Sequence, residues 1–233
     1  MVTSPHHLAS EAGLRVLREG GTAVEATIAM GACLAVVYPH MTAIGGDGFW
    51  LVSKGGEPPV AIDACGAAAG AATPDFYASR GLSAVPWRGP YAANTVAGAV
   101  SGWGEALALS RELGGRLPMA RLVEDAVHHA EAGFPVTASQ EETTAEKLSQ
   151  LADAPGFAGV YLHGGAAPKE GAVMRLPALA RTLKRIRERR RNGHISAAYM
   201  RQLTRRRRHD RWDHRWLLVH GLAVHGLSAM MVQ

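Results

Sequence analysis

The spacing of apolar residues predicts two helices at the start of the sequence. Apolar residues recur three or four positions apart after Ser4-Pro5, an N-cap followed by a proline, and this pattern ends at Gly20-Gly21. Thr22-x-x-Glu25 is a capping box that begins a second helix, and Pro39 ends it. The second segment is apolar almost all round, so we expect it to be buried.

A glycine-rich turn and two short apolar runs predict a β-hairpin directly after this helix. The turn is Ile44-Gly45-Gly46-Asp47-Gly48, where we expect glycine to supply a positive φ. The strands are expected at Phe49–Ser53 and Val60–Asp63, joined by a turn at Lys54–Glu57. Since helix, turn and hairpin follow one another, this stretch is predicted to hold a buried sheet against a buried helix.

Further along the chain, helical periods alternate with glycine and proline. A short helix is predicted after the cap Thr73-Pro74, and a short strand and turn at Tyr161-Leu162 and Gly164-Gly165. Thr137-x-x-Gln140 is a second capping box. The other predicted helices cover residues 98–113, 118–132, 137–152 and 177–186.

Charge divides the chain into two parts. The formal net charge is +5, but residues 1–183 carry −5 and residues 184–233 carry +10. Past Arg187 the helical and strand periods also stop, and Arg189–Arg191 and Arg205–Arg208 form basic runs. We therefore predict a domain at residues 1–187 and a basic, poorly patterned tail at residues 188–233.

Two interpretations of this tail stay open. It is a solvated basic arm, or it results from a reading-frame shift near Arg187–His194 that replaced the domain's own continuation. We favour the second, because arginine repeats mixed with Trp and His are unusual for a selected linker. Specific nucleic-acid binding is not expected of Arg205–Arg208, because a run without a folded reader or stacking platform binds unselectively.

No metal ion or other cofactor is expected. Cys33 lies in the apolar second helix as a small core residue, and Cys65 follows the hairpin without a CxxC motif or a Cys/His cluster nearby. The pairs His6-His7 and His128-His129 are neighbours in sequence, which is poor ligand geometry on a helix.

No membrane segment is expected either. The sequence starts without a charged and then apolar leader. His220 and His225 interrupt the longest apolar run, Trp216–Val232, and burying them in lipid would be costly. We therefore expect a soluble, cytoplasmic protein.

Several separated motifs, in order, resemble the gamma-glutamyltransferase family over about residues 3–186. They are Ser4-Pro5-His6-x-Leu8-Ala9-Ser10, Val16-Leu17-x-x-Gly20-Gly21-x-Ala23-Val24-x-Ala26, Pro39-His40-Met41-x-x-Ile44-Gly45-Gly46-Asp47-Gly48-Phe49, Ala72-Thr73-Pro74, Arg88-Gly89-Pro90, Val96-x-Gly98-Ala99-Val100-x-Gly102-Trp103, Gly115-Arg116-Leu117-Pro118 and Glu131-x-Gly133-Phe134-Pro135-Val136. Each motif alone is weak, but their number and order make the resemblance specific.

The resemblance implies an α+β fold, a partial αββα sandwich of the N-terminal nucleophile hydrolase type, with this chain as a helix-rich large-subunit portion. It implies a precursor that cuts itself into a large and a small subunit. The new N-terminal Thr of the small subunit attacks a gamma-glutamyl or related amide carbonyl, with its own amine as base and backbone N–H groups around the oxyanion. The implied activities are glutathione hydrolysis and gamma-glutamyl transfer, so the implied partners are a small-molecule amide and a small subunit.

Two departures from the family pattern affect the predicted function. The nucleophile segment lies beyond the matching residues, and Thr143-Thr144 falls inside a polar helix. No catalytic residue is therefore assigned, and we expect a truncated chain that is inactive alone. The family's carboxylate-binding Arg follows the second hairpin strand, where this sequence has Cys65. Arg88 is the best remaining cation for a substrate carboxylate, although a surface ion pair is its simpler use.

Two hypotheses about function follow. In the first, the chain is part of a gamma-glutamyltransferase-family enzyme. The pattern around Asp47 and Arg88 resembles the oxamate amidohydrolase-like members, which makes an oxamate-like amide the alternative substrate. In the second, the chain is a non-catalytic scaffold that pairs with a separately encoded small subunit. His40, beside the glycine turn, is expected to be structural. Sheets without the small subunit would expose apolar edges, so the isolated chain is expected to be poorly soluble or marginally stable.

Overall fold

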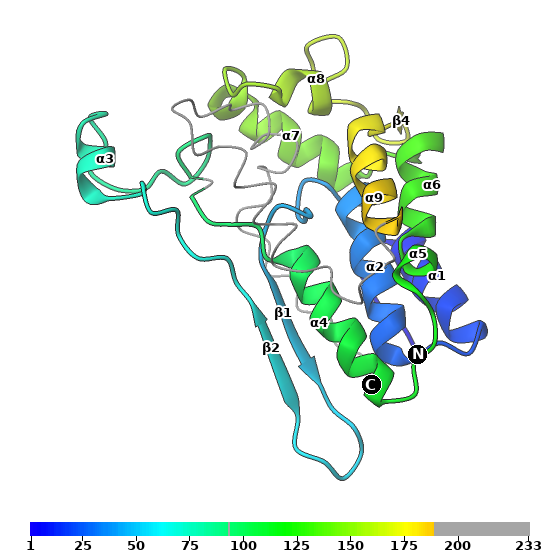
Figure 1. Ribbon diagram of the computed structural model, residues 1–233. Coiled ribbons are helices and arrows are strands. Elements are labelled where there is room, and N and C mark those ends of the chain that lie inside the picture. The colour runs from blue at the N-terminus through cyan, green and yellow to red at the C-terminus, as the bar shows by residue number, and fades with distance from the viewer. Residues whose placement is uncertain (93, 189–233) are drawn as a thin grey trace.

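The computed structural model describes residues 1–92 and 94–188 of the 233-residue chain (Figure 1). The predictions for Arg189–Arg191, Arg205–Arg208 and Trp216–Val232 lie outside the described residues, as does the reading-frame question. The proposed boundary at residue 187 falls one position before the last described residue, so it stays a prediction.

Helices make up most of the described chain. In chain order the elements are α1 (His7–Arg18), α2 (Ala23–Val37), β1 (Gly48–Val52), β2 (Val60–Ala64), α3 (Pro74–Ala78), α4 (Ala99–Glu112), α5 (Met119–Leu122), α6 (Glu124–Ala132), β3 (Phe134–Pro135), α7 (Ala138–Leu151), α8 (Phe157–Tyr161), β4 (Val173–Met174) and α9 (Pro177–Glu188). The hairpin and the predicted helices are confirmed to within a few residues, except that the helix predicted at 118–132 forms two helices.

Helix α2 is the centre of the structure. The capping box predicted at Thr22 and Glu25 is present, and nearly every residue of α2 is buried, as its apolar sequence predicts. Helices α1, α4, α5 and α6 all contact α2, and α9 packs on α5 and α6. Small residues permit these close contacts, since a Cβ at Gly13 of α1 would lie 2.6 Å from Met30 Cγ of α2. We call α1, α2, α5, α6 and α9 the helical body.

Helix α1 begins two residues later than the sequence pattern predicts. The N-cap is His6, not Ser4, and His6 Nδ1 accepts the backbone N–H of Leu8 at 3.2 Å. The Ser4 hydroxyl instead donates to the carbonyl oxygen of His6 at 2.9 Å and lies 2.8 Å from the Ser10 hydroxyl. An imidazole acceptor therefore replaces the expected hydroxyl at the start of the helix.

A fully buried carboxylate joins α2 to the loop after α4. Glu25 accepts the N–H of Thr22 at 2.9 Å and that of Leu117 at 2.8 Å. Arg111 Nη1 lies 3.4 Å from the same carboxylate and provides its counter-charge. Since a buried charge is tolerated only when it is paired and hydrogen-bonded, Glu25 holds this loop against α2.

The hairpin of β1 and β2 is half exposed. The strands are antiparallel, with Trp50 opposite Ile62 and Leu51 opposite Ala61. Trp50 and Ile62 are partly buried on the face that packs against α4, whereas Phe49 and Leu51 on the other face are 51% and 71% exposed. The prediction of a buried sheet is wrong for the described residues, because only one face of the hairpin has a partner. Figure 1 shows its turn extending beyond the helices.

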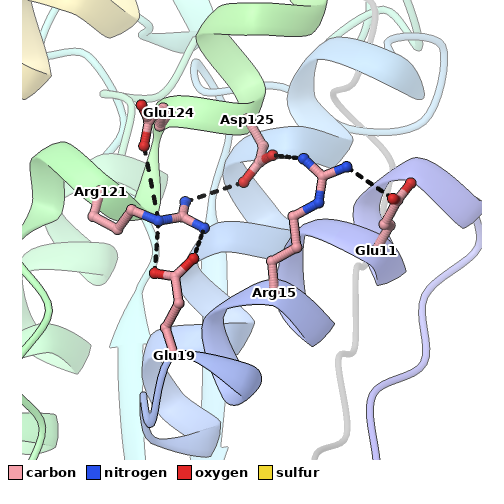
Figure 2. Close-up of polar contacts among 6 residues, drawn as sticks. All are labelled: Glu11, Arg15, Glu19, Arg121, Glu124 and Asp125. Carbon is pink, nitrogen blue, oxygen red and sulfur yellow. Dashed lines mark hydrogen bonds and ion pairs between the residues drawn. The ribbon is translucent and has the colours of Figure 1, made fainter.

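Ion pairs connect α1 to α5 and α6 (Figure 2). Asp125 accepts Arg15 Nη1 at 2.7 Å and Arg121 Nη1 at 3.1 Å, and its side chain is only 10% exposed. Arg121 also donates to Glu19, which caps the C-terminal end of α1, at 2.5 and 2.8 Å, while Glu11 pairs with Arg15 at 2.8 Å. Glu124 Oε2 lies 3.8 Å from Arg121 Nε. We call Glu11, Arg15, Glu19, Arg121, Glu124 and Asp125 the ion-pair network.

Three smaller predictions need correction. The helix expected at 118–132 is interrupted at Val123, where ψ is 2° rather than helical. The strand expected at Tyr161-Leu162 is wrong, because Phe157–Tyr161 forms helix α8 and only an isolated bridge joins His163 to Ala166. Two-residue strands β3 and β4, which the sequence did not predict, pair Phe134 with Met174.

The described residues thus contain two separate two-stranded sheets and no two-sheet sandwich. Mixed helix and sheet is confirmed, whereas the αββα sandwich stays a prediction. No helix in residues 1–92 and 94–188 is long and apolar enough to cross a membrane.

Candidate functional site

Residues 64–69 and 94–98 lie against each other beside the glycine-rich turn. Val96 N donates to Ala67 O at 2.9 Å. A Cβ at Gly66 would lie 1.5 Å from Val96 O, so only glycine allows this approach of the two backbones. The contact fixes the backbone around Cys65, which is where the family resemblance places a substrate-binding residue.

The glycine-rich turn has no glycine with positive φ and binds the start of α4 through its backbone. Among the glycines in the described residues, those with positive φ do not include Gly45, Gly46 or Gly48, so that prediction is wrong. The Gly46 carbonyl accepts the N–H of Gly98 at 3.0 Å and of Ala99 at 2.9 Å, at the start of α4. A Cβ at Gly48 would lie 3.5 Å from Ala99 Cα. The turn is therefore seated directly on the N-terminal end of α4.

Two carboxylates flank Cys65. Asp63 Oδ1 accepts the N–H of Cys65 at 2.9 Å, and Asp47 Oδ1 accepts the N–H of Gly66 at 2.8 Å. Asp47 comes from the glycine turn and Asp63 from β2, so the fold brings together two acids that are far apart in the sequence. The local charge is negative at the position where the family resemblance implies a positive one.

The Cys65 side chain is exposed and stays protonated. Partial desolvation, the charge of Asp47, a hydrogen bond to Asp47 and the charge of Asp63 all raise the pKa of the thiol. A neutral thiol is a poor nucleophile and cannot form the two-pronged ion pair that an Arg makes with a carboxylate. Cys65 therefore cannot bind a carboxylate as the Arg implied by the resemblance would, and its place in a substrate site stays a prediction.

Arg88 points to helix α7. Its Nη1 donates to Gln150 Oε1 at 3.0 Å, and both side chains are exposed. Within the described residues Arg88 makes no ion pair. The surface ion pair that the sequence favoured for Arg88 is therefore replaced by a hydrogen bond to a neutral amide. No hydrogen bond or ion pair joins Arg88 to Cys65 in this part of the chain, and a substrate role for either residue stays a prediction.

His40 is buried and has a hydrogen-bond partner at one ring nitrogen only, because its Nδ1 makes no hydrogen bond in residues 1–92 and 94–188, so its structural role stays a prediction. It is 6% exposed, its Nε2 lies 3.1 Å from Ser139 Oγ of α7, and its ring meets Tyr38 edge-on at 4.3 Å. Desolvation, with a smaller contribution from His6, lowers the pKa of His40 to about 4. A neutral imidazole in this position joins the end of α2 to α7.

The described residues offer no ready nucleophile or metal centre. Thr143 and Thr144 lie inside α7, and Thr144 is buried, as expected for a pair that is not a cleavage point. Cys33 is a core residue, and burial raises the pKa of its thiol to about 12. No group of three or more His, Cys, Asp or Glu side chains in residues 1–92 and 94–188 could hold a metal ion.

Sequence reasoning missed the roles of Asp47 and Asp63. Asp63 had a local signal, because an Asp two residues before an exposed turn residue often accepts its N–H. Asp47 had none, since its partner Gly66 is nineteen positions away and only the fold brings them together.

Comparison with known proteins agrees with the resemblance. The sequence profile of the family described as Gamma-glutamyltranspeptidase matches residues 9–206. The chain is 56% identical over 185 residues to the oxamate amidohydrolase proenzyme of Klebsiella pneumoniae subsp. pneumoniae, which covers 79% of this chain and 35% of that protein. It is 42% identical over 194 residues to the glutathione hydrolase-like YwrD proenzyme of Bacillus subtilis, covering 83% and 36%.

A solved structure of a gamma-glutamyltranspeptidase also resembles this chain. The crystal structure of Helicobacter pylori gamma-glutamyltranspeptidase superimposes with a TM-score of 0.74 at 28% identity, over 88% of this chain and 60% of that one. The chain spans about a third of the length of the curated relatives it matches. On the profile match and the 56% identity, the chain belongs to the gamma-glutamyltranspeptidase family.

Proposed function

We propose that the chain supplies the helix-rich N-terminal part of an amide-cleaving enzyme that acts on a small amide such as oxamate. The nucleophilic Thr implied by the family lies in a further segment or chain. In this assembly the Thr hydroxyl attacks the amide carbonyl, ammonia leaves, and water hydrolyses the acyl-enzyme. The isolated residues 1–188 are inactive.

The observation that carries the substrate assignment is the pair of carboxylates around Cys65. A gamma-glutamyl substrate has its α-carboxylate several bonds from the amide that is cleaved, and Asp47 and Asp63 would repel that group if it reached Cys65. In oxamate the carboxylate is bonded directly to the reacting carbonyl, so it need not extend that far. The 56% identity to an oxamate amidohydrolase proenzyme, against 42% to a glutathione hydrolase-like one, supports the same choice.

The exposed face of the hairpin supports the need for a further segment. Phe49 and Leu51 are adjacent on this face and largely exposed. An apolar strand face at an open sheet is a contact surface awaiting a partner. A second layer packed on this face would bring the hairpin toward the αββα sandwich that the resemblance implies.

The test is ammonia release from oxamate and colour release from a gamma-glutamyl anilide. We expect neither from the purified chain. Co-expression with the remaining, C-terminal two-thirds of the Klebsiella relative should restore ammonia release, with oxamate preferred. Turnover by the chain alone would disprove the inactivity, and preference for the anilide would disprove the substrate.

A variant pair tests the role of Cys65 in the restored enzyme. Cys65→Arg restores a cation between Asp47 and Asp63, so it should raise anilide hydrolysis relative to oxamate by about tenfold. Cys65→Ser keeps a small neutral group and should leave the ratio within about twofold. Equal ratios for both variants would show that this position does not select the substrate.

The non-catalytic scaffold is the second candidate, and the same exposed face of the hairpin favours it. It predicts a stable complex with the Klebsiella segment, seen by size-exclusion chromatography, that cleaves neither amide. Ammonia release by that complex would exclude the scaffold.

A further inference from the structure

A small cavity lies beside the C-terminal end of α2. It has a volume of about 130 Å³ and lies between the end of α2, residues 39–44, α8 and the first turn of α9. Its walls are mainly apolar, formed by Ala35, Pro39, Ile44, Val160, Leu176 and Leu179. An apolar cavity of roughly 150 Å³ accepts benzene, so this one has room for a ligand of about six non-hydrogen atoms.

Tyr161 in the wall carries a hydroxyl that has no hydrogen-bond partner among the described residues. Tyr161 lines the cavity and is only 4% exposed, and its ring is held in place by stacking on Phe157 at 5.6 Å. Within the part of the chain that the structure describes, its hydroxyl makes no hydrogen bond. Burial raises the pKa of Tyr161, so the hydroxyl keeps its proton and can donate it to an acceptor in the cavity. The hydroxyl is therefore available to a ligand or a water molecule in the cavity.

Further donors border the same space. Ala178 and Leu179, in the first turn of the twelve-residue helix α9, line the cavity. Ala180 N–H bonds to Leu176 O at 2.9 Å, and the two N–H groups before it have no carbonyl partner within the helix. The exposed Arg175 lies at the edge of the cavity and makes no ion pair within residues 1–92 and 94–188.

We propose that this cavity binds a small aliphatic monocarboxylate of about three to five carbons. The hydrocarbon part lies against the apolar walls, and the carboxylate accepts from the Tyr161 hydroxyl and the first turn of α9, with Arg175 as its counter-ion. A phosphate or sulfate has no hydrocarbon part for these walls, and a neutral alcohol does not use the cation. The site is separate from Cys65 and does not depend on the proposed amide hydrolysis.

Ligand-observed saturation-transfer NMR on the full 233-residue chain tests the proposal with isobutyrate as the probe. We expect saturable binding with a Kd on the order of 1 mM. The uncharged isostere isobutyramide should bind at least about tenfold more weakly, because it lacks the charge that Arg175 and α9 favour. Octanoate should bind no tighter than isobutyrate, because its chain exceeds the cavity.

Variants assign the contacts. Tyr161→Phe keeps the ring and removes the hydroxyl donor, so the Kd of isobutyrate should rise by about five- to tenfold. Arg175→Gln should make isobutyrate and isobutyramide bind about equally. Arg181→Gln removes an exposed charge from the same helix outside the cavity and should leave binding unchanged.

Results with the unmodified chain alone can overturn the proposal, so it does not rest on whether a variant folds. Equal binding of isobutyrate and isobutyramide would indicate an apolar void without a carboxylate site. Affinity that rises steadily toward octanoate would indicate a surface patch. Absence of saturable isobutyrate binding would remove the site altogether.

Discussion

The helical body and the hairpin differ in how completely they bury their apolar residues. In the helical body, α2 is covered on all sides by its neighbours, and charged groups such as Glu25 and Asp125 are paired where they are buried. The hairpin packs one face on α4 and leaves Phe49 and Leu51 exposed. The difference indicates that the helical body buries its apolar residues within the described chain, whereas the outer face of the hairpin has no partner there.

The largest effect is expected from removing the buried carboxylate. Glu25→Ala leaves the N–H groups of Thr22 and Leu117 without an acceptor and Arg111 without its counter-charge. We expect a loss of about 3–5 kcal/mol in the free energy of unfolding, measured by urea denaturation. The matched control is Glu57→Ala in the hairpin turn, where the exposed pair with Lys54 is worth less than about 1 kcal/mol. Similar losses for both variants would contradict the distinction between the two regions.

Acid is expected to weaken the helical body next most strongly. Burial, with smaller contributions from His7 and His129, lowers the pKa of His6 to about 4, and burial lowers that of His40 to about 4 as well. The unfolded chain therefore binds protons at these residues from about pH 6.5 downward while the folded chain does not. The stability that the two neutral histidines provide is therefore complete above pH 6.5. Below that pH the free energy of unfolding falls toward pH 4, by up to about 1.4 kcal/mol per pH unit for each histidine.

A variant of the N-cap isolates this effect. His6→Asn keeps an acceptor for the Leu8 N–H but cannot titrate, so the pH slope between 6.5 and 4.5 should fall by up to one proton. The interval ends at 4.5 because carboxylates with a lowered pKa, such as Glu11 and Glu141, contribute increasingly toward lower pH, and equally in both proteins. His163→Asn, in an exposed turn, is the matched control. An unchanged slope in His6→Asn would show that His6 is not the group responsible.

These two predictions rest on contacts of Glu25 and His6, and the sequence predicts only some of these contacts. The capping box at Thr22 and Glu25 was readable because both partners lie within one helical turn. The same glutamate's contact with Leu117 was not, because its partner is ninety-two positions away. The N-cap of α1 was misplaced because Ser4 is the more usual capping residue, and a local rule cannot tell that His6 will be buried.

In the candidate site, too, the sequence predicts local features and not contacts between distant residues. The position of Cys65 after the second strand was readable from hairpin spacing, but the carboxylate of Asp47 beside it was not. The strand pattern predicted the bounds of both hairpin strands to within a residue, since alternation is a local property. Whether its outer face is covered depends on residues elsewhere, so alternation alone could not predict that Leu51 is exposed.

A moderate effect is expected in the ion-pair network. Arg121 is 19% exposed and joins Glu19 to Asp125, so it fixes α1 against α5 and α6 (Figure 2). We expect Arg121→Gln to lower the free energy of unfolding by about 1–2 kcal/mol at low salt, and by less at 1 M salt. Lys54→Gln in the hairpin should cost less than about 0.5 kcal/mol at either salt concentration. A double-mutant cycle with Asp125→Asn gives the pair's coupling energy, and additive losses would mean that the two side chains are not coupled.

The smallest change in stability is expected on the exposed face of the hairpin. Leu51 is 71% exposed and lies opposite Ala61, so Leu51→Thr removes little buried surface and keeps a residue that favours strands. We expect the free energy of unfolding to change by less than about 0.5 kcal/mol, while the protein concentration at which light scattering begins should rise. Ile62→Thr, on the face that packs against α4, is the matched control and should cost about 1–2 kcal/mol. A loss as large for Leu51→Thr would mean that the outer face is already packed in this chain, and the hairpin would then need no further partner.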